Sequence, residues 1–176
     1  MTYSKSFTTA RKKFHGMISK STNEIDLSHA INTQEWLERL HGSSDEIVTL
    51  AAFAHDIERA LPDRMNLEDF EDYNSYKSAH AKRGGLTAEE IALSSGYSKK
   101  DAARLRDLIT NAEFSSTDPD VQKVCDADSI SFFDNNLESY EAKNSLERTR
   151  KKAEFMYGRA SDKAKQAIDK ILSTSD

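Results

Sequence analysis

Apolar residues recur at helical spacing along much of the chain. The first such stripe lies between Ser6 and Ser19, where basic residues separate the apolar positions, and it predicts an outer amphipathic helix. A second helix is expected from Asp26, a good N-cap residue, to His41, with Gly42 as its stop. Both helices present an apolar face that needs a partner to cover it.

The next segment differs because it is apolar almost all round. Ser43 or Ser44 is expected to cap a helix from Asp45 to about Ala60. Its stretch IVTLAAFAHDI predicts a central, buried helix.

Weaker periodicity follows the central helix. The acidic segment 63–75 is interpreted as a loop or lid with at most a short helix. Residues 76–83 are expected to be helical, Gly84 and Gly85 to interrupt the helix, and Thr87 to open another. Later helices are expected at about 100–112, 120–133, 145–157 and 161–172.

Composition agrees with this helical pattern. Among 176 residues there are 6 glycines and 2 prolines, so turn-forming residues are scarce. We therefore expect an all-α, single-domain helical bundle spanning residues 1–176. The sequence shows no internal repeat and no domain linker.

The charge is mixed and gives no general attraction to nucleic acid or to an anionic membrane. There are 25 basic and 30 acidic residues, for a net charge of -5. No apolar run is long enough to span a bilayer. Cys125 is the only cysteine and is expected in the core, and a cytoplasmic location is the prediction. A monomer and a homodimer both remain open.

His55 and Asp56 stand side by side at the end of the apolar run. Burial of an unpartnered carboxylate there costs several kcal/mol or shifts its pKa until it is neutral. A metal ion solves the problem, because it binds a carboxylate and a neutral imidazole together.

A second carboxylate occupies an apolar stripe further along the chain. Asp128 follows Val121, Val124 and Cys125 at helical spacing, so it is expected to face the core and to need a cation. Asp126 has more polar helical neighbours and is kept as a residue that supports the ligands.

His29 lies among apolar residues on the helix before the central one. Alone it reads as a hydrogen-bonded core histidine, but with His55, Asp56 and Asp128 it becomes a candidate ligand. Two histidines and two carboxylates suit one divalent ion of Mn, Fe, Co, Ni, Zn or Mg.

The order LSHA, then FAHDIERAL, then VCDADSISFFD resembles the HD-domain superfamily of metal-dependent phosphohydrolases. The likeness covers about residues 26–133, and the helices at about 145–172 are compatible with it. It implies a helical bundle with a central metal held by His29, His55, Asp56 and Asp128. Members with two metals carry more histidines between the HD pair and the last aspartate. Here only His80 lies in that interval, which favours one ion.

The expected reaction is attack of a metal-activated water on a nucleotide or another small phosphate ester. Asp56 and Glu58 are the candidate catalytic residues, with Glu58 as general base or water-orienting group. Arg59 is the candidate phosphate clamp, because Glu58 and Arg59 follow His55 by three and four residues and share its helix face. An ordinary surface ion pair between Glu58 and Arg59 is the equal alternative.

Further cations are candidates for substrate binding. Lys82 and Arg83 precede the helix expected at Thr87, where a tight turn with solvated charges is slightly favoured over an anion site at the helix start. His80 is a candidate acid or phosphate contact, with an ordinary helix-surface residue as the alternative. Arg148, Arg150, Lys151, Lys152 and Arg159 are interpreted as a solvated basic helix face, with a phosphate-binding edge as the alternative.

Two other function classes remain open. The first is a non-catalytic nucleotide-binding or signalling module of HD type, which would bind its ligand without turnover. The second is an iron-dependent oxygenase of HD fold, but such enzymes resemble two-metal sites and have more histidines than this chain.

Overall fold

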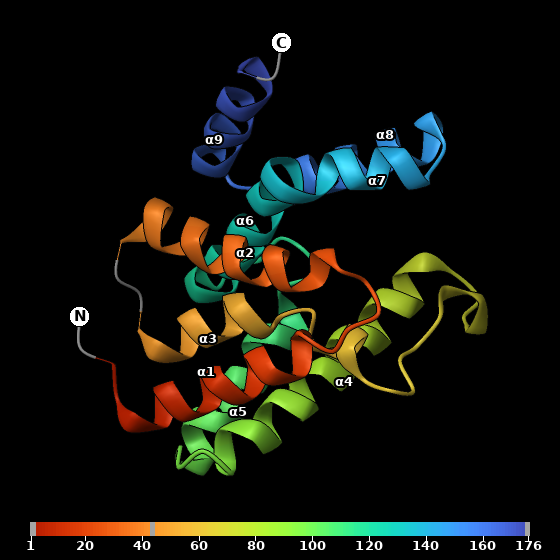
Figure 1. The fold of residues 1–176 in the computed structure, drawn as a ribbon. Helices are drawn as coiled ribbons and strands as arrows, with labels where there is room; N and C mark the ends of the chain where they lie inside the picture. Colours follow the sequence, from red (N-terminus) through yellow and green to blue (C-terminus); the bar gives the residue numbers. More distant parts are fainter. Residues whose placement is uncertain (1–2, 43–44, 175–176) are drawn as a thin grey trace.

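The computed structural model describes residues 3–42 and 45–174, and within them the chain is helical with no β-strand (Figure 1). The predicted all-α bundle is confirmed. The α-helices are α1 (Lys5–Ile18), α2 (Ile25–His41), α3 (Glu46–Ala54), α4 (Tyr73–Leu93), α5 (Lys99–Asn111), α6 (Pro119–Ser131), α7 (Leu137–Lys143), α8 (Leu146–Arg159) and α9 (Asp162–Ser173). Short 3-10 turns at Ile57–Ala60 and Leu67–Asp69 and a π turn at Phe132–Asn136 join some of them.

Side-chain caps account for where most helices begin. In seven helices, the side-chain oxygen of a Ser or Asp at the N-cap accepts a hydrogen bond from a backbone N–H of the first turn. These N-cap residues are Ser4, Asp45, Asp72, Ser98, Asp118, Ser145 and Ser161. The expected cap at Ser43 or Ser44 lies outside the described residues, and Asp45 caps α3 through the N–H groups of Ile47 and Val48.

The core has two parts that meet at α6. Buried residues of α1 to α6 form the larger part, with α3 inside it, since every residue from Ile47 to Ala54 is buried. The smaller part joins the end of α6 to α8 and α9, which lie above the rest of the bundle in Figure 1. The all-round apolar pattern of α3 thus correctly predicted a central helix.

The central helix is shorter than expected. It ends at Ala54, and the backbone of Asp56 (φ -101°, ψ 20°) has left the α-helical region before the 3-10 turn at Ile57–Ala60. The prediction of a helix through Ala60 is therefore wrong at its last turn. His55 and Asp56 stand at this break, where adjacent side chains can face a common point.

The expected interruption at Gly84 and Gly85 is also wrong, because α4 runs through both glycines. An added Cβ on Gly85 would lie 2.5 Å from Thr110 Oγ1 and 2.8 Å from the Arg106 carbonyl, both in α5. On Gly84 it would lie 3.7 Å from the His55 carbonyl. Gly85 therefore allows close packing of α4 against α5, whereas a Cβ on Gly84 would make ordinary van der Waals contacts. Thr87 opens no new helix.

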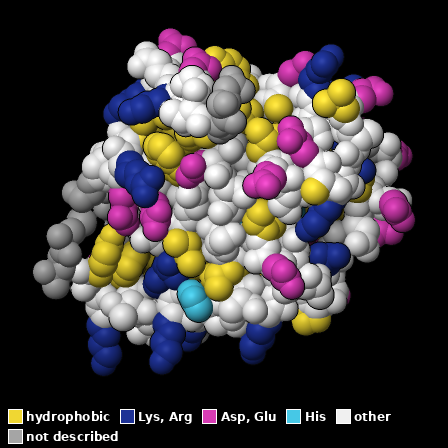
Figure 2. Space-filling view, turned by 45° about the horizontal axis from the view of Figure 1, so that its top comes forward, with side chains coloured by type: hydrophobic (Ala, Val, Ile, Leu, Met, Phe, Trp, Pro, Cys, Tyr) yellow, Lys and Arg dark blue, Asp and Glu magenta, His cyan; other side chains and the backbone are white. Residues whose placement is uncertain are grey.

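The segment 63–72 is a loop with one short 3-10 turn, as predicted, although α4 begins at Tyr73 rather than at residue 76. On the face shown in Figure 2, basic and acidic side chains are mixed over most of the surface, and basic side chains alone project along the lower edge. Within the described residues, no helix has the length and apolarity needed to cross a membrane.

Candidate metal centre

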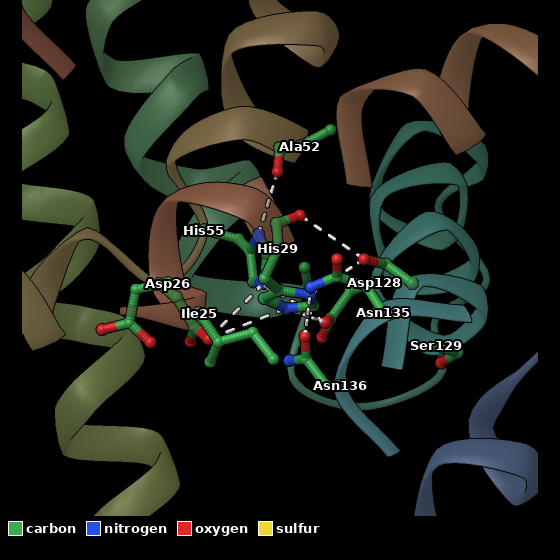
Figure 3. A network of polar contacts seen from close by, with 12 residues as sticks. Ile25, Asp26, His29, Ala52, His55, Asp128, Ser129, Asn135 and Asn136 are labelled. Atoms are coloured by element: carbon green, nitrogen blue, oxygen red, sulfur yellow. Dashed lines mark hydrogen bonds and ion pairs between the residues drawn. The ribbon is translucent and has the colours of Figure 1, made fainter. Parts of the chain in front are cut away.

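Three side chains from separate helices converge at the middle of the bundle. His29 comes from α2, His55 from the end of α3 and Asp128 from α6. Asp128 Oδ1 lies 3.0 Å from His29 Nε2 and 3.2 Å from His55 Nε2, and the two Nε2 atoms are 3.2 Å apart. Figure 3 shows these side chains pointing at one another. Three atoms able to ligate a metal thus face a single point.

The other nitrogen of each ring is already engaged. His55 Nδ1 lies 2.9 Å from the Ala52 carbonyl, which can only accept, so His55 carries a proton on Nδ1. His29 Nδ1 lies 2.8 Å from Ser131 Oγ, and that hydroxyl faces the His29 carbonyl at 3.4 Å. This arrangement favours a proton on His29 Nδ1 too. In neutral rings both Nε2 lone pairs then point at the Asp128 carboxylate.

The ionisation of the cluster reflects this crowding. Burial disfavours the charged form of His55, but Asp128 and Asp56 outweigh it and raise the pKa of His55 to about 9. Burial lowers the pKa of His29. Burial raises the pKa of Asp128, but the charges of His55 and Arg159 outweigh this effect and hold that pKa well below its ordinary value. Asp128 and Asp56 therefore favour the protonated form of His55.

Asp56 stands at the edge of this cluster. Its Oδ2 lies 3.7 Å from His55 Nε2 and 4.0 Å from His29 Nε2. The same oxygen is 3.2 Å from Arg59 Nε, and Oδ1 is 3.1 Å from His80 Nε2. All four predicted ligands are therefore close together, with Asp56 further out than the other three.

His80 joins Asp56 to Glu58. Its Nδ1 lies 2.9 Å from Glu58 Oε2, and both side chains are buried. Glu58 also accepts from the Met65 N–H at 2.8 Å and lies 3.3 Å from Arg83. Glu58 thus fixes the His80 ring and the loop after Pro62. It is connected to the cluster through His80, whose other nitrogen contacts Asp56.

A buried cation supports Asp128 from behind. Arg159, at the end of α8, is bonded to Asp128 Oδ2 and donates to Ser129 Oγ at 3.0 Å and the Glu113 carbonyl at 2.9 Å. Lys77 Nζ in turn lies 2.6 Å from Glu113 Oε2. Asp56, His80 and Glu113 also present oxygens and a nitrogen within 4.8 Å of one another, a second group able to hold a metal ion.

The chain matches, over residues 10–176, the family described as "Domain of unknown function (DUF4202)". It belongs to this family. No curated protein and no solved structure matches it. The family description assigns no activity, so the site geometry is the basis for any functional argument.

Two of the predicted substrate-binding residues lie differently from the expectation. Lys82 is exposed and lines a surface cavity with Thr110 and Asn111, with no contact to the cluster. Arg83 binds Glu58 and Asp63. Because α4 is continuous, neither residue flanks a helix start, and the helix-start argument for an anion site there fails.

Other residues near the predicted site have structural partners. Asp126 is buried and accepts from Ser161 N–H and Oγ at 2.8 and 2.6 Å, so it fixes the start of α9 instead of supporting the ligands. Cys125 is buried, as predicted.

Sequence reasoning missed the buried cations. The prediction of a solvated basic face is wrong for Arg159, whose exposed fraction is 6%. Its position three residues after the buried Met156 was the available signal, because that spacing places both on one face of α8. No comparable spacing indicated that Lys77 is buried. Its burial depends on the contact between α4 and the loop after α5, where Lys77 pairs with Glu113.

A narrow cavity of about 60 Å³ opens over the cluster. Polar and aromatic side chains from several helices line it, among them His29, Asp56, Arg59, Lys77, Asp128, Phe132, Tyr140 and Lys152. The arrangement places cations around the mouth of a carboxylate and histidine cluster, which suits an anionic ligand.

Proposed function

We propose that this protein is a metal-dependent phosphohydrolase. The observation that carries the proposal is the convergence of His29 Nε2, His55 Nε2 and Asp128 Oδ1 at 3.0–3.2 Å, with both Nδ1 atoms engaged elsewhere. Three donor atoms so close together form a site that could hold one divalent cation.

The donor set fits a divalent transition metal. Two imidazole nitrogens and a carboxylate, with Asp56 beside them, suit Mn, Fe, Co, Ni or Zn, and Mg less well. When bound, such an ion lowers the pKa of its water from 15.7 towards about 7 and offsets charge on a phosphoryl oxygen. His29, His55, Asp56 and Asp128 would hold it.

The remaining residues have roles that follow from their contacts. Glu58 holds His80 at Nδ1, so His80 Nε2 can keep or pass a proton beside Asp56. We therefore assign the acid–base role to the Glu58–His80 pair rather than to Glu58 alone. Arg59 lines the cavity and is one third exposed, which keeps it a phosphate-binding candidate although it pairs with Asp56 and Asp26.

The first experiment measures bound metal per chain after purification without chelator and after supply of Mn, Co, Ni or Zn. About one equivalent is expected in the wild type, with loss in His55→Ala and Asp128→Ala. His15→Ala is the matched control, because His15 is exposed on α1. A wild type that takes up none of these metals would refute the proposal and leave a protonated His55 to hold the cluster together.

Activity is then tested by phosphate release from nucleotides and small phosphate esters. Release that depends on the metal and on His55 supports hydrolysis. Stable binding of a nucleotide to the metal-loaded protein without release would instead favour the non-catalytic module. The cytoplasmic location and the monomeric or homodimeric state remain predictions, testable by fractionation and by light scattering.

A further inference from the structure

The charges around the site are paired, with one exception. Each of four buried or partly buried carboxylates has a cation beside it: Asp128 has Arg159, Asp56 has Arg59, Glu58 has Arg83, and Glu113 has Lys77. Lys152 also lines the cavity over the site. Within residues 3–42 and 45–174, no carboxylate forms an ion pair with it.

The contacts of Lys152 offer its ammonium no full negative charge. Its Nζ lies 3.5 Å from Tyr73 Oη, 5.7 Å from the centre of the Phe132 ring and 5.6 Å from that of Phe155, and such cation–π contacts stabilise a cation less than a carboxylate or phosphate would. Burial, followed by repulsion from Lys77 and Arg159, lowers the pKa of Lys152 to about 7. An anion bound beside the ammonium would remove this penalty.

A larger pocket lies on the other side of Lys152. Its volume is about 300 Å³, which reaches the size of small-molecule sites. Lys152 and Tyr140 line both this pocket and the cavity over the cluster. The remaining walls come from the loop before α4, from α4 and from α8: Leu67, Tyr73, Arg148, Lys151 and Phe155.

We propose that Lys152 and this pocket recognise the substrate, which is a phosphate ester of a flat aromatic group. Its phosphate lies between the metal cluster and Lys152, and its ring lies among Tyr73, Tyr140 and Phe155. This assignment rests on the proposed function for the reaction, but the recognition itself is a separate property. Three aromatic side chains around one pocket favour a ring over a sugar or a short alkyl chain, because flat π surfaces stack.

The positions of Arg148 and Lys151 extend the argument. Both are exposed and line the same pocket, so the pocket is apolar inside and basic outside. Further negative charge on the substrate would therefore meet Arg148 and Lys151 at the rim, where Lys151 Nζ also pairs with Glu147 Oε1 at 2.7 Å. The basic residues of α8 would thus contribute to substrate binding: Lys152 lines the cavity over the cluster, and Arg148 and Lys151 border the larger pocket.

The test uses ligands that cannot be hydrolysed, so that it does not depend on turnover. Binding of 1-naphthylmethylphosphonate and of propylphosphonate to the metal-loaded protein is measured by calorimetry. The two probes share the phosphonate and differ in the ring. The wild type is expected to bind the naphthyl probe at least about tenfold more tightly.

Variants separate the two halves of the proposal. Lys152→Met should weaken both probes by about 10- to 100-fold, the value of a hydrogen bond between charged groups, and Lys152→Arg should restore much of it. Phe155→Leu should weaken only the naphthyl probe. Lys143→Met and Phe7→Leu are the controls, because neither residue lines the pocket and Phe7 packs on Tyr3, so neither change should alter binding. Circular dichroism checks that each variant is folded.

Two results would overturn the inference: equal binding of both probes by the wild type, or unchanged binding in Lys152→Met. The proposed function fails separately. If 1-naphthyl phosphate binds with the expected dependence on Lys152 but releases no phosphate, recognition stands and hydrolysis does not. If phosphate is released equally from naphthyl and glycerol phosphates, hydrolysis stands and the aromatic pocket does not.

Discussion

Arg159 is the buried cation on which the geometry of Asp128 depends, so its removal tests the reasoning about the site. The guanidinium is bonded to the Asp128 carboxylate and also donates to Ser129 Oγ and to the carbonyls of Ala112 and Glu113. Arg159→Met keeps an apolar stem of similar length. It removes the charge that offsets Asp128 and leaves buried acceptors without a donor.

The expected cost is large because one partner of a buried pair remains. Breaking such a pair costs about 3–5 kcal/mol in free energy of unfolding. For a chain of this length that corresponds to a fall in Tm of roughly 6–20 °C. The contacts to Ser129 and the two carbonyls place the value towards the upper end.

The assay is urea unfolding of the metal-free protein, followed by circular dichroism, with Arg150→Met as the matched control. Arg150 lies on the same helix and is exposed, so its loss should change the free energy of unfolding by less than about 0.5 kcal/mol. If Arg159→Met does not fold, Arg159→Lys serves instead and should cost about 1–3 kcal/mol, because it keeps the charge and loses the forked geometry. A loss in either variant no greater than in the control would refute the account of Asp128.

Three further predictions concern packing, capping and ligand orientation. Gly85→Ala should destabilise the protein by about 1–3 kcal/mol in urea unfolding, because its Cβ meets α5 at 2.5 Å. Gly16→Ala, with open space around it, should be neutral or stabilising by up to about 1 kcal/mol. Asp45→Ala should cost about 1 kcal/mol at pH 7. Burial opposes ionisation of Asp45, but Arg104 and the capped amides lower its pKa below 3.8, so the stability that its charge contributes is present above pH 3.8 and is lost as the pH falls through the folded-state pKa. A difference from wild type that grows on acidification would contradict this. Ser131→Ala should weaken metal binding by about 10- to 100-fold, measured by competition with a chelator, because Ser131 orients His29. Unchanged affinity would show that the ring is held by packing alone.

The fold was largely predictable from local signals. Caps at Ser98, Asp118 and Ser161 and the all-round apolar run of α3 depend on neighbours within a few residues, so helix positions follow from the sequence. Gly84 and Gly85 show where this reasoning fails. Both glycines suggest a break because glycine lowers helix propensity, yet α4 continues through them, and at Gly85 the helix α5 packs so closely that a Cβ would not fit.

The candidate site divides in the same way. His29, His55, Asp56 and Asp128 stood out because each is polar in an apolar context, and the structure brings them together. Their supporting cations did not stand out. Whether a lysine or arginine on an amphipathic helix is buried depends on what packs against it, and for Arg159 that partner lies 31 residues earlier in the chain.

The pairing of charges has a consequence for how the protein should respond to metal removal. The carboxylates of Asp56, Glu58, Glu113 and Asp128 each have a cation from the chain, and a proton on His55 relieves the crowding of the two rings. The bundle therefore needs no ion to balance its buried acids, unlike small domains that unfold without metal. Chelation should keep the helical far-ultraviolet signal and lower the Tm of the metal-loaded protein only by the amount that binding linkage allows. Collapse of the helical signal on chelation would mean that the metal, rather than Arg59, Lys77, Arg83 and Arg159, holds these acids in place.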